Sequence, residues 1–118
     1  MPTRRQKRVG ELLHEELSDL LQKKVMDPRI GFVTVTAVEV SPDLRWARVF
    51  VTSLGDQKAL LEGLRHASGF LRRELGQRLS LRYVPDLTFH LDDSFERASR
   101  VLNLIQEIEK ELNDGQDN

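Results

Sequence analysis

The chain has 118 residues, of which 39% are hydrophobic and 31% are charged. This length fits one domain with a modest core, and the absence of cysteine excludes disulfides, thiolate zinc sites and cysteine nucleophiles. No stretch approaches the ~18 apolar residues of a membrane span, and no apolar signal segment follows the basic N-terminus. We therefore expect a cytoplasmic protein that does not enter a membrane.

The formal net charge of -1 conceals an uneven distribution. Residues 1–91 hold 15 Lys and Arg against 11 Asp and Glu, a net +4, whereas residues 92–118 hold 3 against 8, a net -5. Clustered positive charge is typical of a nucleic-acid surface, because each neutralised phosphate releases condensed counterions. A solvated charged face is the alternative.

The first predicted element is an amphipathic helix over residues 5–24, because apolar residues recur at steps of three and four from Val9 onward. Positive charge is mildly unfavourable at a helix N-terminus. This end nevertheless carries Arg4, Arg5, Lys7 and Arg8. These cations indicate either that this end has a role besides helix formation or that it is a frayed basic arm. A turn is predicted at 27–31, where Pro28 cannot continue the helix.

Residues 32–40 and 45–53 alternate in the pattern of β-strands, and the Ser-Pro-Asp-Leu sequence between them predicts a turn. The two strands should form an antiparallel hairpin. Regular alternation places Val35 and Glu39 on the same face of the first strand. In the second strand, Trp46 lies near Arg45 and Arg48; we expect it to pack, with stacking of a base as the alternative.

Asp56 predicts the N-cap of a second helix whose apolar spacing continues to Leu81. The spacing passes through Gly69 almost in phase, which predicts a kink at 67–69 rather than two unrelated helices. A glycine there permits positive φ and a close approach of another backbone. On the outer side, cations form a row across the kink at Lys58, Arg65, Arg72 and Arg73.

Residues 87–92 predict a third strand, and a final amphipathic helix follows from Ser94 to about residue 113, with a polar tail to residue 118 that we expect to be disordered. We expect the apolar stripe of this helix to pack on the sheet, with recruitment of a partner protein by the acidic helix as the alternative. Asp93 is well placed to cap the helix. A metal pair or nuclease site at Asp92 and Asp93 is less favoured, because adjacent strand residues point to opposite faces.

The order helix, strand, strand, kinked helix, strand, helix predicts a small α+β domain over residues 1–112. We expect the helices on one face of a three-stranded sheet and the other face open. A third strand that runs parallel to a hairpin strand would make the intervening helix a right-handed crossover.

Several segments, in their order and spacing, resemble the bacterial ribosome-binding factor A family, which has a KH-type fold with its extra helix and strand at the N-terminus. The resemblance covers about residues 3–112 and is carried by residues 27–29, 33–36, 40–44, 47–51, 71–75, 81–89 and 92–94. It implies a KH-like type II fold. It also implies binding to the free small (30S) ribosomal subunit, assistance in late maturation and 16S rRNA 5′-end processing, and a role in cold adaptation.

The resemblance places residues 67–69 where ordinary KH domains carry a Gly-x-x-Gly loop, which clamps backbone phosphates. The second glycine is missing here, which argues against a four-nucleotide clamp. We predict a monomer that binds the small ribosomal subunit, through its 16S rRNA or also through ribosomal proteins, without a cofactor or a metal. Catalysis is not expected, since His14, His66 and His90 are scattered. The predicted RNA-binding residues are Arg4, Arg5, Lys7, Arg8, Arg45, Arg48, Lys58, Arg65, Ser68, Gly69, Arg72 and Arg73.

Overall fold

The computed structural model describes residues 1–23, 30 and 33–116, and within the last helix it describes the side chains of residue 94 and residues 102–113. Most of the predicted turn at 27–31, and Phe32, lie outside the described residues. The elements are α1 (Arg4–Lys23), β1 (Thr34–Val40), β2 (Trp46–Thr52), α2 (Gln57–Arg78), β3 (Asp86–Leu91) and α3 (Ser94–Gln116). This order confirms the predicted α+β sequence of elements.

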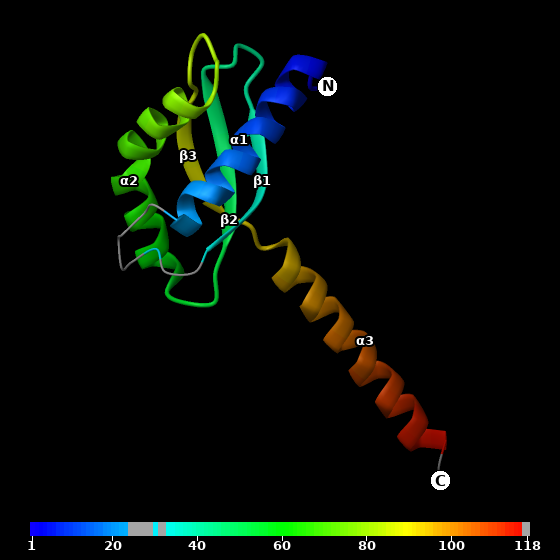
Figure 1. Ribbon diagram of the computed structural model, residues 1–118. Coiled ribbons are helices and arrows are strands. Elements are labelled where there is room, and N and C mark those ends of the chain that lie inside the picture. The colour runs from blue at the N-terminus through cyan, green and yellow to red at the C-terminus, as the bar shows by residue number, and fades with distance from the viewer. Residues whose placement is uncertain (24–29, 31–32, 117–118) are drawn as a thin grey trace.

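The central strand of the sheet is β2, in the order β1-β2-β3. It pairs antiparallel with β1 and parallel with β3, which confirms both the hairpin and the crossover through α2. Figure 1 shows α1 and α2 on one face of this sheet. We call α1, α2 and the sheet the body of the protein.

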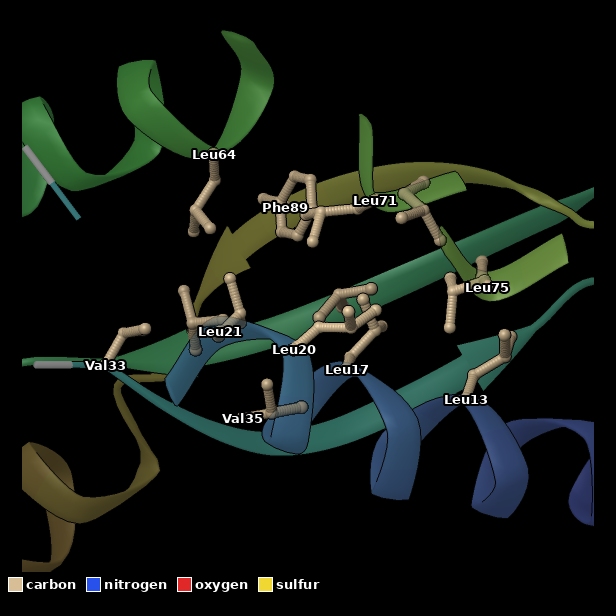
Figure 2. Packing of buried hydrophobic residues seen from close by; sticks show 14 of the residues in the cluster. Leu13, Leu17, Leu20, Leu21, Val33, Val35, Leu64, Leu71, Leu75 and Phe89 are labelled. Atoms are coloured by element: carbon tan, nitrogen blue, oxygen red, sulfur yellow. The ribbon is translucent and has the colours of Figure 1, made fainter. Parts of the chain in front are cut away.

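The core lies between the two helices and the sheet. Leu13, Leu17 and Leu20 of α1 are fully buried, as are the apolar residues of α2 that face them. Figure 2 shows these side chains meeting Val35 and Phe89 from the strands. Burial of each such side chain stabilises the fold by ~1.5–3 kcal/mol, so this cluster fixes how the helices lie on the sheet.

The N-terminal end of α1 is fixed by a capping box. Thr3 Oγ1 accepts from Gln6 N at 3.1 Å, and Gln6 Oε1 accepts from Thr3 N at 2.7 Å. The buried Gln6 also donates through Nε2 to Val40 O at 2.9 Å, which joins α1 to β1. One turn later the helix approaches the strand closely, since a Cβ on Gly10 would lie 3.1 Å from Val38 O. The basic N-terminal end is therefore ordered helix from Arg4 onward rather than a frayed arm.

A β-bulge in β1 makes the predicted alternation wrong. The register passes from Val35 opposite Val51 to Ala37 opposite Phe50, so Thr36 is the extra residue. Val35 points into the core, and the extra residue after it exchanges the inward-facing and outward-facing positions in the rest of the strand. Val40 is buried, whereas Glu39 lies opposite Arg48 and is exposed.

The second helix, α2, is one continuous helix through residues 67–69, as its unbroken phase predicts. Its axis changes direction near the middle in Figure 1. Asp56 is confirmed as the N-cap, because its side chain accepts from Ala59 N at 3.1 Å. Arg78 near the other end donates to Glu16 and Asp19 of α1, and these ion pairs of 3.1 and 2.7 Å hold the two helices together.

The last helix, α3, extends away from the body in Figure 1. The prediction that its apolar stripe packs on the sheet is wrong for the described side chains. Exposed fractions of 45%, 48% and 62% are found for Ile105, Ile108 and Leu112. Because α3 lies apart from the body, the assignment of residues 1–112 to one domain stays a prediction. The helix continues to Gln116, beyond the predicted end near residue 113, and disorder of the polar tail also stays a prediction.

Candidate nucleic-acid interface

Three segments that are distant in sequence meet at one end of the body, at the top of Figure 1: the N-terminal end of α1, the β1–β2 turn, and residues 79–85 between α2 and β3. Five exposed arginines lie on these segments or on the adjacent end of α2. We use the name basic end for these arginines together with the exposed Tyr83. The arginines are Arg5, Arg8, Arg45, Arg73 and Arg82.

Two grooves flank Tyr83 at the basic end. The first, with a volume of about 530 Å³, is lined by Arg5, Arg45 and Arg82, and includes apolar side chains such as Leu81. The second, of about 470 Å³, is lined by Arg73 and Arg82 and begins beside Gly69. Arginines and apolar side chains therefore line both grooves, and the two grooves share one aromatic ring.

The charge of the basic end is strongly positive. Among the described residues that line the two grooves, Asp43 is the one acid. Its carboxylate accepts from Ser41 Oγ at 2.7 Å and from Arg45 N at 3.1 Å, and the hydrogen bond from Ser41, followed by that from Arg45, lowers the pKa of Asp43 below its ordinary value. The same two linings hold five arginines, namely Arg5, Arg45, Arg72, Arg73 and Arg82, so five arginines less one aspartate leave a net +4, a balance suited to phosphate groups.

Arg72 has a role that the sequence pattern does not indicate. Its Nη1 forms an ion pair with Asp86 Oδ1 at 2.9 Å, and its Nη2 donates to Val84 O at 3.0 Å. The guanidinium carbon also lies 5.8 Å from the centroid of the Tyr83 ring. The predicted outward row of cations therefore breaks at Arg72, whose guanidinium holds the 83–86 segment against α2.

Comparisons with known proteins identify the family of the chain. The family model for ribosome-binding factor A matches residues 5–105. The chain belongs to this family. A ribosome-binding factor A from Syntrophus aciditrophicus (strain SB) is 49% identical over 118 residues, covering 97% of this chain and 96% of the relative. Another from Brevibacillus brevis (strain 47) is 50% identical over 107 residues, or 88% of each chain.

Solved structures agree with this assignment. The crystal structure of ribosome-binding factor A from Thermus thermophilus has a TM-score of 0.68 and 28% identity, covering 73% of this chain and 94% of that chain. The solution structure of a Thermotoga maritima protein described as a putative ribosome binding factor A has a TM-score of 0.55 and 34% identity, covering 76% and 89%. The expected KH-like fold is thereby confirmed.

Other residues that the sequence predicts to bind RNA lie away from the basic end. Arg48 is on the open face of the sheet, where its Nη2 forms an ion pair of 2.7 Å with Glu39 Oε2. Lys7 and Arg48 line a separate groove of about 670 Å³ with Trp46. Trp46 is 53% exposed, so the expectation that it is packed is wrong. Arg4 is exposed at the start of α1.

The predicted row on α2 spans most of the helix rather than one site. Lys58 lies 14 residues before Arg72, or about 21 Å along the helix axis, at the end opposite the basic end. Arg65 is exposed between them. Ser68 Oγ donates to Arg65 O at 2.9 Å, so this hydroxyl is already used within the helix. Lys58 and Arg65 have exposed side chains but do not join the basic end.

Gly69 does not serve the close approach that the sequence suggests. A Cβ built there would have Arg73 Nη1, at 4.0 Å, as its nearest neighbour outside the local helix backbone, and the residue does not adopt positive φ. Within the described fold, Gly69 therefore uses neither the positive φ nor the close approach of another backbone that a glycine permits. Gly69 instead lines the second groove beside Arg73, where its lack of a side chain leaves space.

The acidic pair before α3 has a structural use. Asp92 Oδ1 accepts from Ser94 N at 2.9 Å and from Ser94 Oγ, and Asp92 Oδ2 accepts from Thr36 Oγ1 at 2.6 Å. Asp92 thus caps α3 and joins it to the bulge of β1, while capping by Asp93 stays a prediction. Among the side chains that the structure describes, no three His, Cys, Asp or Glu residues form a metal-binding group, and none of the described helices has the length and hydropathy of a membrane span.

Arg82 and Tyr83 are the residues of the basic end that sequence patterns do not single out. Both belong to a short segment without periodicity, which predicts a loop and no more. The signal that identifies them is their position beside Arg5 and Arg45, which the chain brings near only after folding. In contrast, the Thr3–Gln6 capping box can be read directly from the spacing of the two residues.

Proposed function

We propose that the protein binds the free small ribosomal subunit through the basic end and assists late maturation of its RNA, including processing at the 16S rRNA 5′ end. The single observation that carries this proposal is that four exposed arginines from separate segments, Arg5, Arg45, Arg73 and Arg82, line the two grooves beside Tyr83. Family membership supports it. A Thermus thermophilus ribosome binding factor A that is 28% identical, with a TM-score of 0.63, is described as fitted into a map of a 30S complex; the match covers 71% of this chain and 91% of that chain.

The proposed action is steric and electrostatic. The basic end would occupy a junction in the maturing RNA, hold one arrangement of its strands, and leave when the mature arrangement displaces it. Backbone phosphates would be neutralised by arginine, which gives binding that weakens steeply with salt. The missing Gly-x-x-Gly motif favours recognition of folded RNA over clamping of a four-nucleotide strand.

Three further properties belong to this proposal. The protein acts as a monomeric assembly factor rather than an enzyme, it works in the cytoplasm where small subunits are assembled, and it supports growth in the cold. Family membership supports these statements. Primer extension on 16S rRNA 5′ ends in a strain that lacks the protein, at normal and low temperature, tests the maturation role directly.

The binding proposal is tested by sedimentation of the purified protein with free small subunits and with joined ribosomes. We expect it to travel with the free subunit alone. Charge reversal at three residues of the basic end, Arg45, Arg73 and Arg82, should abolish binding while the circular dichroism spectrum and thermal midpoint stay unchanged. Charge reversal at Lys58, on the far end of α2, is the matched control and should retain most of the affinity. Equal affinity of the triple variant and the wild type would disprove the assigned surface.

A second function is favoured by the exposed apolar stripe of α3: recruitment of a partner protein. The described part of the helix is acidic, with Glu107, Glu109 and Glu111 against Lys110, so the complementary partner would have an apolar groove with basic edges. Replacing Ile105 and Ile108 by serine tests this function. Loss of small-subunit binding with an intact basic end would make α3 the principal contact, whereas unchanged binding would show that the basic end suffices.

A further inference from the structure

Tyr83 occupies the centre of the basic end and is 50% exposed. It lines both grooves, as does Arg82 next to it. A tyrosine ring so exposed does not contribute its full area to the core, and its position is therefore not explained by packing alone. Its neighbours show how it is held and what could lie against it.

The ring is held by contacts that leave little freedom to the chain around it. The Arg72 guanidinium lies over the ring and is itself fixed at its two terminal nitrogens, Nη1 by Asp86 at 2.9 Å and Nη2 by Val84 O at 3.0 Å. Asp86 N donates to Arg45 O at 2.8 Å, which joins the same segment to the β1–β2 turn. Pro85 between them is fully buried. The ring and the Arg45 backbone are thus placed before any ligand arrives.

The chemistry around this ring matches an unpaired nucleotide. Proteins bind unpaired RNA by stacking bases on aromatic rings while nearby cations neutralise the backbone. Here the aromatic ring is Tyr83, and the cations are Arg45 and Arg82 in one groove and Arg73 in the other. A phosphate next to a stacked base would therefore meet an arginine in either groove.

We propose that Tyr83 stacks an unpaired base of small-subunit RNA, with Arg82 and its neighbours in the two grooves on the adjacent phosphates. This inference deepens the proposed function and rests on it, because it names the kind of RNA element recognised. A protein surface is the competing occupant. The positive net charge of the grooves favours RNA, since a chain of phosphates is the ligand most complementary to arginines in two grooves that share one aromatic ring.

The test uses the full chain and purified free small subunits, with affinity measured over a range of salt concentrations. Tyr83→Leu keeps a side chain of apolar character but removes the π-face, and it should weaken binding about 5- to 150-fold. Tyr83→Phe should bind like the wild type. Because stacking releases no counterions, Tyr83→Leu should leave the slope of log affinity against log salt unchanged. Trp46→Leu, which removes another half-exposed aromatic ring, is the matched control and should retain affinity.

A second measurement uses the wild-type protein, so its result does not depend on whether a variant folds. Ultraviolet cross-linking of the complex, followed by peptide mapping, should join Tyr83 to a nucleotide of the RNA. A cross-link from Tyr83 to a ribosomal protein, or a correctly folded Tyr83→Leu variant that binds as tightly as the wild type, overturns the inference. Failure of the wild type to bind small subunits at all overturns the proposed function instead, so the two failures are distinguishable.

Discussion

Arg72 Nη1 lies 2.9 Å from Asp86 Oδ1, and this ion pair joins the C-terminal part of α2 to the first residue of β3. Arg73, the next residue after Arg72, is exposed and lines the groove beside Gly69. Two adjacent arginines, which look equivalent in the sequence, therefore differ in role. Arg72 stabilises the segment that carries Tyr83, and Arg73 faces outward.

Replacing Arg72 by methionine should destabilise the fold by about 1 kcal/mol, because the ion pair and the hydrogen bond to Val84 O are lost while the aliphatic part of the side chain is kept. Urea unfolding at neutral pH measures this change. Arg73→Met is the matched control and should leave the free energy of unfolding unchanged. Equal destabilisation by the two variants would contradict the division of roles.

Replacing Arg82 by glutamine should lower small-subunit affinity and flatten its dependence on salt. If Arg82 neutralises one phosphate, the slope of log affinity against log salt should decrease by ~0.7–0.9. Titrations at several salt concentrations give this slope. Lys58→Gln removes the same charge from the far end of α2 and should leave the slope as it is; a flatter slope there would extend the interface along the helix.

Replacing Gly69 by alanine should stabilise the protein by ~0.5–1 kcal/mol, because the added methyl group meets open space and alanine favours the helix. Gly10→Ala should raise the free energy of unfolding by less, or lower it, since its Cβ would lie 3.1 Å from Val38 O, where α1 packs closely on β1. Thermal unfolding of the two variants side by side checks the contrast. A stabilising Gly10→Ala with a destabilising Gly69→Ala would reverse our interpretation of both sites.

The ion pairs between α1 and α2 predict a pH dependence of stability. The hydrogen bond from Arg78, and next that from Lys23, lower the pKa of Asp19 below its ordinary value of 3.8. The folded state is therefore favoured by ionised Asp19 at pH values above 3.8, and this contribution is lost as the pH falls through the lower folded pKa.

Arg78→Met should consequently be less stable than the wild type at neutral pH, and the difference in urea midpoint should shrink as the pH falls below 3.8. Lys58→Met, which removes an exposed cation from the same helix, serves as the control at each pH. A difference between Arg78→Met and the wild type that stays constant into acid would show that the variant acts through packing rather than through Asp19.

Much of the fold follows from local patterns. The spacing of Leu13, Leu17 and Leu20 predicts the buried face of α1, and the Asp56 carboxylate predicts the start of α2. These predictions succeed because apolar periodicity and capping depend on residues three or four positions apart, whose geometry is fixed within one turn of helix.

Other features depend on contacts between distant segments. The bulge at Thr36 reverses the faces of Val40 and Glu39, although a regular strand is the simplest interpretation of the alternation. The stripe of α3 is amphipathic like that of α1, yet its described part remains exposed. An amphipathic pattern states that a helix has an apolar face; it does not state that the same chain covers that face.

The sequence by itself determined the class of fold, the order of the elements, the family and the presence of a basic surface. Only the tertiary structure decided which cations form that surface: Arg72 turns to Asp86, Arg48 pairs with Glu39, and Arg82 joins Arg5 and Arg45 around Tyr83. The physical reason is that helices and strands are selected by short-range spacing, whereas an RNA-binding surface is selected by the positions of charges that meet only when the chain is folded.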